Sequence, residues 1–366
     1  MTNQTDFLDF RFIKKALNRI LPNSQAVALL IIILVSFVLI ITLSDLLMPV
    51  FASVVLAYLL DGLVAKAASC KIPRLPAVYL VFFGFMTSLG FLIFVLLPML
   101  SEQAVELVQH IPEIVKQAQK EIMRLPEMYP QFISEGRIRE FMLGVQRELL
   151  TYGQGALSFS AASVIGLVTA LVYLFLVPMM VFFFLKDKET IVNWFEQFMP
   201  RDRHLTESVW KEVDMQIGNY VRGKFAEVVI LMAISYVTYS AMGLNYSILL
   251  SVLMGLSVII PYVGATLVTF PVLGIAYFQW GLSGDEFMYI VIAYSVIQAL
   301  DGVVLVPLLF SEAVNLHPIA IIVAILFFGG MWGFWGVFFA IPLATVVKAV
   351  LTAWPRIGET GLDTIY

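Results

Sequence analysis

The sequence predicts an all-α, polytopic integral membrane protein with about eight transmembrane helices, a short re-entrant hairpin and a helical insert outside the membrane. Three observations support this class. The 366-residue chain is 60% hydrophobic and only 13% charged, whereas soluble domains contain about 25% charged residues. No lysine or arginine occurs between Lys224 and Lys348. Several apolar runs also reach the about 20 residues that a helix needs to cross the hydrocarbon.

The first three spans are expected within residues 24–100, at 24–43, 46–64 and 77–100. A basic, amphipathic N-terminus, residues 1–23, precedes them, and it lacks the pattern of a cleaved signal peptide. Because basic loops favour the cytoplasmic side, we place this segment and the loop between Lys66 and Arg74 inside.

Residues 101–156 form a polar insert of mixed charge, expected as an extracytoplasmic helical hairpin. Apolar residues recur at three- and four-residue intervals from Ala104 to Ile122, the pattern of an amphipathic helix. Pro126 and Pro130 end this helix, and a second begins near Ile138. The apolar stripes either pack against each other or contact neighbouring subunits.

The fourth span is expected at residues 157–185 and ends at Lys186. Residues 186–224 contain seven lysines or arginines and predict a cytoplasmic amphipathic connector. This connector is either a passive surface helix or an element that transmits motion. A C-terminal membrane domain with broken helices, 225–350, and a cytoplasmic tail, 351–366, complete the chain.

Two short apolar runs in the C-terminal membrane domain, 246–260 and 264–277, either re-enter the membrane or cross it. We favour a re-entrant hairpin because both runs are shorter than a full span. Pro261, Gly264 and Pro271 interrupt them. These residues form either a hinge that exposes backbone dipoles to a substrate or a tight helical turn.

The clearest candidate site lies around Asp301. Tyr294, Gln298 and Asp301 follow one another at intervals of four and three residues, so they share one helical face. Gly302 and Pro307 come next and favour a local helix break. Asp301 either binds a proton or sodium ion as a coupling group, or is a structural carboxyl bonded to a neighbouring helix.

A second group of polar residues, Glu312, Asn315 and His317, interrupts two apolar runs and predicts a re-entrant or interfacial loop. His317 suits either proton relay or a local hydrogen bond. The sequence contains one cysteine and no ligand-spaced histidines, so we expect no metal site and no cofactor. It also lacks a phosphate-binding loop and a nucleophile paired with a base, which argues against an enzyme. The net charge of -4 argues against a nucleic-acid partner.

Several motifs resemble those of the autoinducer-2 exporter family, and within it of the PerM-type permease branch. They are Phe182–Lys188, Ile217–Lys224, Ile260–Gly264, Gln298–Gly302, Asn315–Pro318 and Ala340–Leu343. The resemblance implies an all-helical fold with about eight membrane spans and a helical outer insert, homo-oligomeric assembly and a bacterial inner-membrane location. Basic residues in the N-terminal segment, and Lys348 and Arg356 near the C-terminus, place both termini in the cytoplasm. Family members are described as exporters of the autoinducer-2 signal, as sodium or lithium/proton antiporters, or as permeases.

These observations predict a secondary transporter of a small polar metabolite or a cation, surrounded by membrane lipid and coupled to protons or sodium. Two alternatives remain open. One is a non-transporting scaffold that recruits an envelope protein partner through residues 101–156, and the other is a channel.

Overall fold

The computed structural model describes residues 42, 44–122, isolated positions between 136 and 148, and 164–197, 204–261, 263–282, 284–310 and 316–353. Every secondary-structure element in these ranges is helical, which confirms the all-α class. Six helices are long and apolar enough to cross a membrane, or seven if a bent pair forms one span. The prediction of about eight spans is therefore not confirmed. The N-terminus, nearly all of the first predicted span, most of the second insert helix and the C-terminal tail lie outside the described residues.

The described residues belong to two compact units. The first unit contains residues 44–59, 183–222 and 310–353. The second contains 60–122, 164–182 and 223–309, together with the isolated positions of the insert.

Helices α3 (Ser44–Ser69) and α4 (Arg74–Phe91) are joined by a turn in which Lys71 has a φ of 68°. This turn coincides with the predicted basic loop. A π-helical segment, η1 (Leu92–Leu96), then leads directly into α5 (Leu97–Ile122). Pro98 follows η1 by two residues and cannot donate a backbone hydrogen bond, which explains why the helix widens here.

The predicted insert does not begin with a new helix. The continuous apolar helix from Arg74 to Gln117 contains 44 residues, which corresponds to about 66 Å at about 1.5 Å per residue. The hydrocarbon is only about 30 Å thick, so this helix extends well beyond one span. Helix α5 continues through Ser101 without a break. It does not pack only within the insert, because Leu107 contacts the core of the second unit.

Helix α8 (Val164–Lys186) ends where the sequence predicts, and the chain bends by 81° into α9 (Lys188–Glu196). Helix α10 (His204–Ala241) then runs for 38 residues. It joins the amphipathic part of the predicted connector and the following span into one helix, because no proline interrupts this stretch. The helix ends before Gly243, whose φ of 71° is typical of a helix C-terminus.

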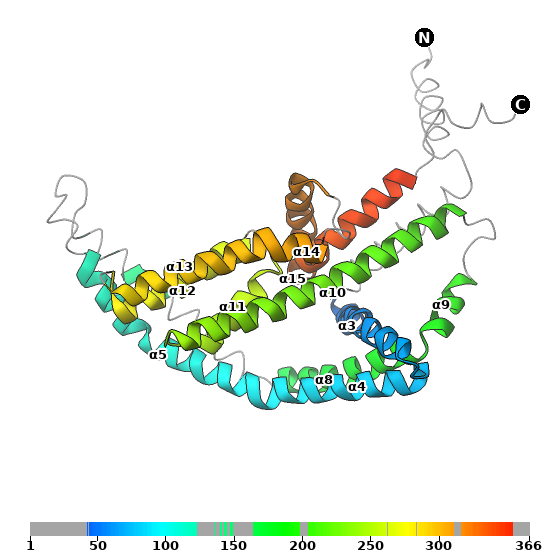
Figure 1. Ribbon diagram of the computed structural model, residues 1–366, viewed down its shortest axis with the longest axis horizontal. Coiled ribbons are helices and arrows are strands. Elements are labelled where there is room, and N and C mark those ends of the chain that lie inside the picture. Colours follow the sequence, from blue (N-terminus) through cyan, green and yellow to red (C-terminus); the bar gives the residue numbers. More distant parts are fainter. Residues whose placement is uncertain are drawn as a thin grey trace, which may run out of the picture. The chain divides into compact units, whose positions relative to one another are not determined.

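The core of the second unit is formed largely by α10, α11 (Ser247–Ser257), α12 (Val263–Trp280) and α13 (Asp285–Leu300). Helix α12 packs on both α11 and α13 (Figure 1). A second π-helical segment, η2 (Asp301–Leu305), continues α13 into α14 (Val306–Phe310). Since α11 has 11 residues, it is about 17 Å long and too short to cross the hydrocarbon alone. Helix α12, with 18 residues, meets the length of a candidate span.

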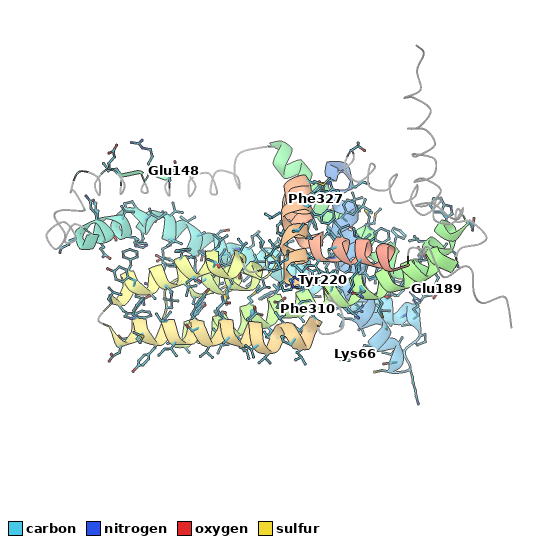
Figure 2. All side chains as sticks on the ribbon, turned by 90° about the horizontal axis from the view of Figure 1, so that it is seen from above. Lys66, Glu148, Glu189, Tyr220, Phe310 and Phe327 are labelled. Carbon is cyan, nitrogen blue, oxygen red and sulfur yellow. The ribbon has the colours of Figure 1, made fainter. Side chains whose placement is uncertain are left out.

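In the first unit, helix α15 (Pro318–Ala353) is broken at Gly333, which has a φ of 57° and a ψ of -132°. The two halves pack on each other, with Ala324 and Phe328 on one side and Ala340 on the other. A Cβ atom on Gly336 would overlap the Phe328 carbonyl, so a glycine is needed at this close approach. The same unit contains the buried ring of Tyr220, which lies beside Phe310 with ring centroids 5.9 Å apart (Figure 2).

Replacing Gly333 by alanine should lower the free energy of unfolding by about 1–3 kcal/mol, because its backbone conformation is accessible almost only to glycine. Gly330→Ala is the matched control: a Cβ there would meet nothing within 4 Å and the φ is not positive. Thermal unfolding in detergent measures both. Equal effects of the two substitutions would contradict the break at Gly333.

Candidate functional site

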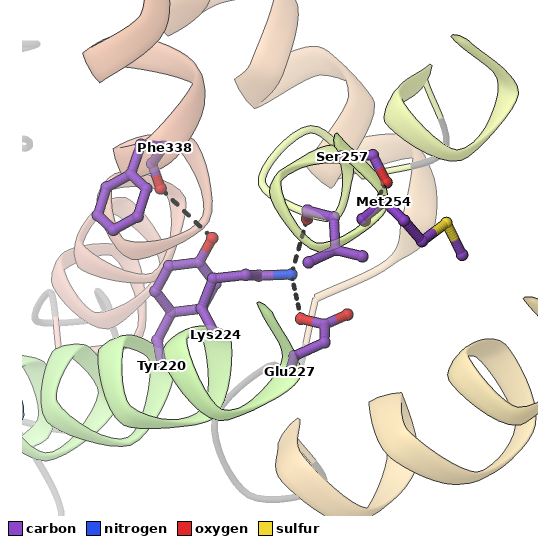
Figure 3. Close-up of polar contacts among 7 residues, drawn as sticks. Tyr220, Lys224, Glu227, Met254, Ser257 and Phe338 are labelled. Carbon is purple, nitrogen blue, oxygen red and sulfur yellow. Dashed lines mark hydrogen bonds and ion pairs between the residues drawn. The ribbon is translucent and has the colours of Figure 1, made fainter. Parts of the chain in front are cut away.

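A lysine and a glutamate are buried together on α10, three residues apart. Their exposed fractions are only 6% for Lys224 and 2% for Glu227. Lys224 Nζ lies 2.6 Å from Glu227 Oε2 (Figure 3). Both residues fall within the candidate span Asp214–Ala241. Removing two charges from water carries a large desolvation cost, so this ion pair requires excellent geometry or further polar partners.

The Lys224 ammonium has a second acceptor at the end of α11. It donates a 3.0 Å hydrogen bond to the carbonyl oxygen of Val258, the C-terminal capping residue of that helix (Figure 3). The last carbonyls of a helix lack intrahelical donors and form the negative end of the helix dipole. Lys224 therefore stabilises the end of α11. Gly255 permits the close approach, since its Cβ would lie 2.7 Å from the Val228 carbonyl oxygen of α10.

The predicted hinge residues Pro261 and Gly264 form the turn between α11 and α12. Gly264 is buried, and its amide donates a 2.9 Å hydrogen bond to the Ile260 carbonyl. A Cβ atom on Gly264 would overlap the carbonyl of Ser257. The tight turn thus places the C-terminal end of α11 next to Lys224, while Pro271 lies further along, inside α12.

Asp301 begins the π-helical segment η2. The Val306 amide donates to the Asp301 carbonyl, a spacing of five residues instead of four. Pro307 follows directly and lacks an amide hydrogen, which favours such a widened turn. Instead of the local break expected at Gly302 and Pro307, the helix continues through a π-helical segment, and both residues are exposed. Segments of this kind occur often at functional sites.

The Asp301 side chain completes a cluster with the ion pair. Its carboxyl lies close enough to interact electrostatically with both Lys224 and Glu227. The Oδ1 atom of Asp301 is buried and accepts no hydrogen bond from any residue that the structure describes. We name Lys224, Glu227 and Asp301 the charge cluster.

When all three groups are ionised, the charge cluster holds two carboxylates against one ammonium and carries one net negative charge. An uncompensated charge in a low-dielectric interior is costly. A bound proton or monovalent cation would neutralise it. Within the described ranges, no three histidine, cysteine or acidic side chains are grouped as a metal site.

Tyr294 and Gln298 share the helical face of Asp301, as predicted, and bind neighbouring helices. The Tyr294 hydroxyl lies 2.9 Å from the Ala265 carbonyl and 2.6 Å from Thr269 Oγ1, both on α12. Gln298 Nε2 donates to the Tyr294 hydroxyl at 2.8 Å and contacts the Met254 sulfur of α11 at 3.7 Å. These contacts connect α13 to α11 and α12, about one helical turn before Asp301 along α13.

The remaining predicted residues lie in the loop before α15. Glu312 and Asn315 are outside the described residues. His317 is exposed, and its Nδ1 accepts a hydrogen bond from the Ile319 amide at 3.3 Å. This contact caps the start of α15, which corresponds to the local hydrogen-bonding alternative for His317.

Sequence reasoning missed Lys224 and Glu227 as site residues. It assigned Lys224 to the polar connector and did not select Glu227. The available signal was their spacing, because a lysine and a glutamate three residues apart lie on one helical face. Leu231 follows Glu227 by one turn and is fully buried, which marks this face as internal.

The helices and the buried charges define a multi-pass α-helical membrane protein. The chain belongs to the AI-2E transporter family, whose model, described as "AI-2E family transporter", matches residues 28–356. This family consists of transporters and not of enzymes.

Two relatives illustrate the range of similarity. The chain is 45% identical over 333 residues to the "Putative permease PerM" of Escherichia coli K12, covering 91% of this chain and 94% of that protein. It is 21% identical over 311 residues to the "AI-2 transport protein TqsA" of the same strain, covering 84% of this chain and 86% of the relative. One name describes a permease and the other a transport protein.

Proposed function

We propose that this protein is a secondary transporter of the bacterial inner membrane that moves a small polar metabolite or a cation, with both termini in the cytoplasm. The charge cluster is its coupling site, and a proton or sodium ion is the coupling ion. The observation that carries this proposal is the pairing of two carboxylates, buried Glu227 and half-buried Asp301, with the single ammonium of Lys224 inside candidate spans. Membership of a transporter family supports the same function.

The chemistry of coupling follows from charge balance. A proton or monovalent cation that binds between Asp301 and Glu227 removes the net negative charge. Ion binding then changes the energetic cost of keeping the site buried, so it can favour one conformation over another. Lys224 and Glu227 of α10 meet the end of α11 and the π-helical segment η2 at this site. The turn after α11 and the widened turn of η2 are irregular backbone on which such a change can act.

Asp301→Asn should abolish the dependence of transport on the coupling ion, because it removes the excess carboxylate and leaves one ammonium against one carboxylate. Two probes measure this in proteoliposomes of the full chain. A pH-sensitive dye inside the vesicles reports proton movement after a sodium pulse, and labelled autoinducer-2 reports uptake under an imposed pH gradient. If the wild-type protein and Asp301→Asn showed equal flux and equal ion dependence, the assignment of Asp301 as the coupling residue would be overturned.

The scaffold alternative makes the opposite prediction. If residues 101–156 recruit an envelope partner and the chain does not transport, deleting this insert abolishes the cellular phenotype while Asp301→Asn has no effect. We also propose homo-oligomeric assembly, which the mass of the detergent-solubilised protein, measured by light scattering, tests directly.

A further inference from the structure

Two hydroxyl groups are buried in the second unit without a hydrogen-bond partner among the described residues. They belong to Ser235 and Tyr239, one turn apart on α10. Both residues are 0% exposed. The two side chains interact with each other, although their geometry falls short of a hydrogen bond. Buried polar groups are nearly always paired with protein or ordered water, so such a pair of hydroxyls calls for an explanation.

These hydroxyls connect to the charge cluster through α13. Tyr239 interacts electrostatically with Tyr294, and the Tyr294 hydroxyl accepts a hydrogen bond from Gln298. Gln298 lies three residues before Asp301, on the same helical face. On α10 itself, the fully buried Leu231 separates Ser235 from Glu227. The polar row therefore runs from α10 across to α13, where Gln298 lies three residues before Asp301.

We propose that Ser235, Tyr239 and Tyr294 form, together with ordered water, a path along which protons reach Asp301 and Glu227, and that the Gln298 amide, which donates to the Tyr294 hydroxyl, holds this hydroxyl in place. This inference rests on the proposed function and deepens it, because it assigns the proton as the coupling ion. In each transfer a hydroxyl or water passes its own proton to the next acceptor and receives another. The path groups end unchanged, and one carboxylate gains one proton.

The composition of the row favours a proton over a sodium ion. A metal cation that leaves water needs its hydration shell replaced by several oxygen ligands at once. The row offers isolated hydroxyls, spread over a distance of about 18 Å between Glu227 and Tyr239 at about 1.5 Å per residue. A proton needs only a connected series of hydroxyls and waters.

The ionisable groups around this row lie on α5, on α13 and in the charge cluster. Helix α5, which packs on the same core through Leu107, carries Glu106 and His110, and His110 Nδ1 lies 2.8 Å from the Tyr246 hydroxyl at the start of α11. Tyr294 faces it from α13, and the charge cluster lies at its far end. Helices α11 and α12, which belong to the same core, contain no charged residue. The charge cluster is therefore the acceptor for protons that enter along the row.

The test follows protonation of the buried carboxyl directly, with the full chain in lipid nanodiscs and the proton as the probe. After a rapid pH drop, time-resolved infrared spectroscopy detects the carbonyl stretch of the protonated carboxyl, assigned by its loss in Asp301→Asn. Tyr239→Phe and Ser235→Ala should each slow its appearance by about tenfold or more, with the final amplitude unchanged. Thermal unfolding should stay at or above the wild-type temperature, because both substitutions remove an unpaired buried hydroxyl.

Two control substitutions remove buried hydroxyls that do have partners. Ser53 donates to the Pro49 carbonyl at 2.6 Å, and Tyr220 donates to the Phe338 carbonyl at 3.3 Å. Ser53→Ala and Tyr220→Phe should leave the protonation rate unchanged.

The outcomes separate this path from the proposed function. Wild-type protonation rates in folded Tyr239→Phe and Ser235→Ala would overturn the path, and the proteoliposome test of Asp301→Asn would still stand on its own. A carboxyl band that does not respond to pH would also overturn it. Slower protonation without any flux in proteoliposomes would retain the path as a proton-access route and reject the transport function.

Discussion

Replacing Lys224 by methionine should lower the free energy of unfolding by about 3–5 kcal/mol, the cost of leaving a buried charge without its partner. The substitution keeps much of the side-chain volume but removes the ammonium that binds Glu227 at 2.6 Å and the Val258 carbonyl at 3.0 Å. Two carboxyl groups then remain in the interior without a cation. Thermal or denaturant unfolding in a defined detergent measures the loss.

A double substitution separates lost charge balance from lost packing. Lys224→Met combined with Glu227→Gln should recover part of the stability, because the second change removes one of the two uncompensated carboxylates. Lys66→Met, at the exposed end of α3, is the matched control and should change stability by no more than about 0.5 kcal/mol. Additive effects of the two cluster substitutions would show that Lys224 and Glu227 are not energetically coupled.

Replacing Gly264 by alanine should cost about 3 kcal/mol, at the upper end of the range for overpacking. The added Cβ would overlap the carbonyl of Ser257, a backbone atom that cannot move without displacing the end of α11. Such a displacement also pulls the Val258 carbonyl away from Lys224. We therefore expect lower thermal stability together with weaker ion dependence of transport in proteoliposomes.

Gly274→Ala is the control on the same helix. A Cβ at Gly274 would meet nothing within 4 Å, so alanine should raise stability by about 0.5–1 kcal/mol through its better helix propensity. If both glycine substitutions had equal effects, the tight turn at Gly264 would not determine the position of α11.

Hydropathy predicted where apolar helices occur but not how far each helix continues. The break at the Lys66–Arg74 loop and the end of α8 at Lys186 were predicted because charges and turn residues coincide there. The continuations of α4 into α5 and of the connector into α10 were not. A change from apolar to polar composition reports a change of environment, whereas the backbone hydrogen bonds of a helix can continue across it, and from α4 to α5 the helix continues even past Pro98 and Pro112.

The candidate site shows the same division. The helical period placed Tyr294, Gln298 and Asp301 on one face, and the structure shows that face directed at neighbouring helices. The partners of Asp301 could not be inferred, because Lys224 and Glu227 lie on another helix and are distant in the sequence. The sequence also could not predict that the hydroxyls of Ser235 and Tyr239 are both buried without a partner, since an isolated serine or tyrosine in an apolar run usually has a local partner.

The sequence by itself determined that this chain is an α-helical membrane protein and which positions carry unavoidable charge, because solvent preference is a property of the residues themselves. Only the tertiary structure decided that Asp301 meets Lys224 and Glu227, and that Gly264 brings the end of α11 onto the same lysine. These contacts depend on how helices remote in sequence pack, and packing is settled by the shapes of the facing surfaces.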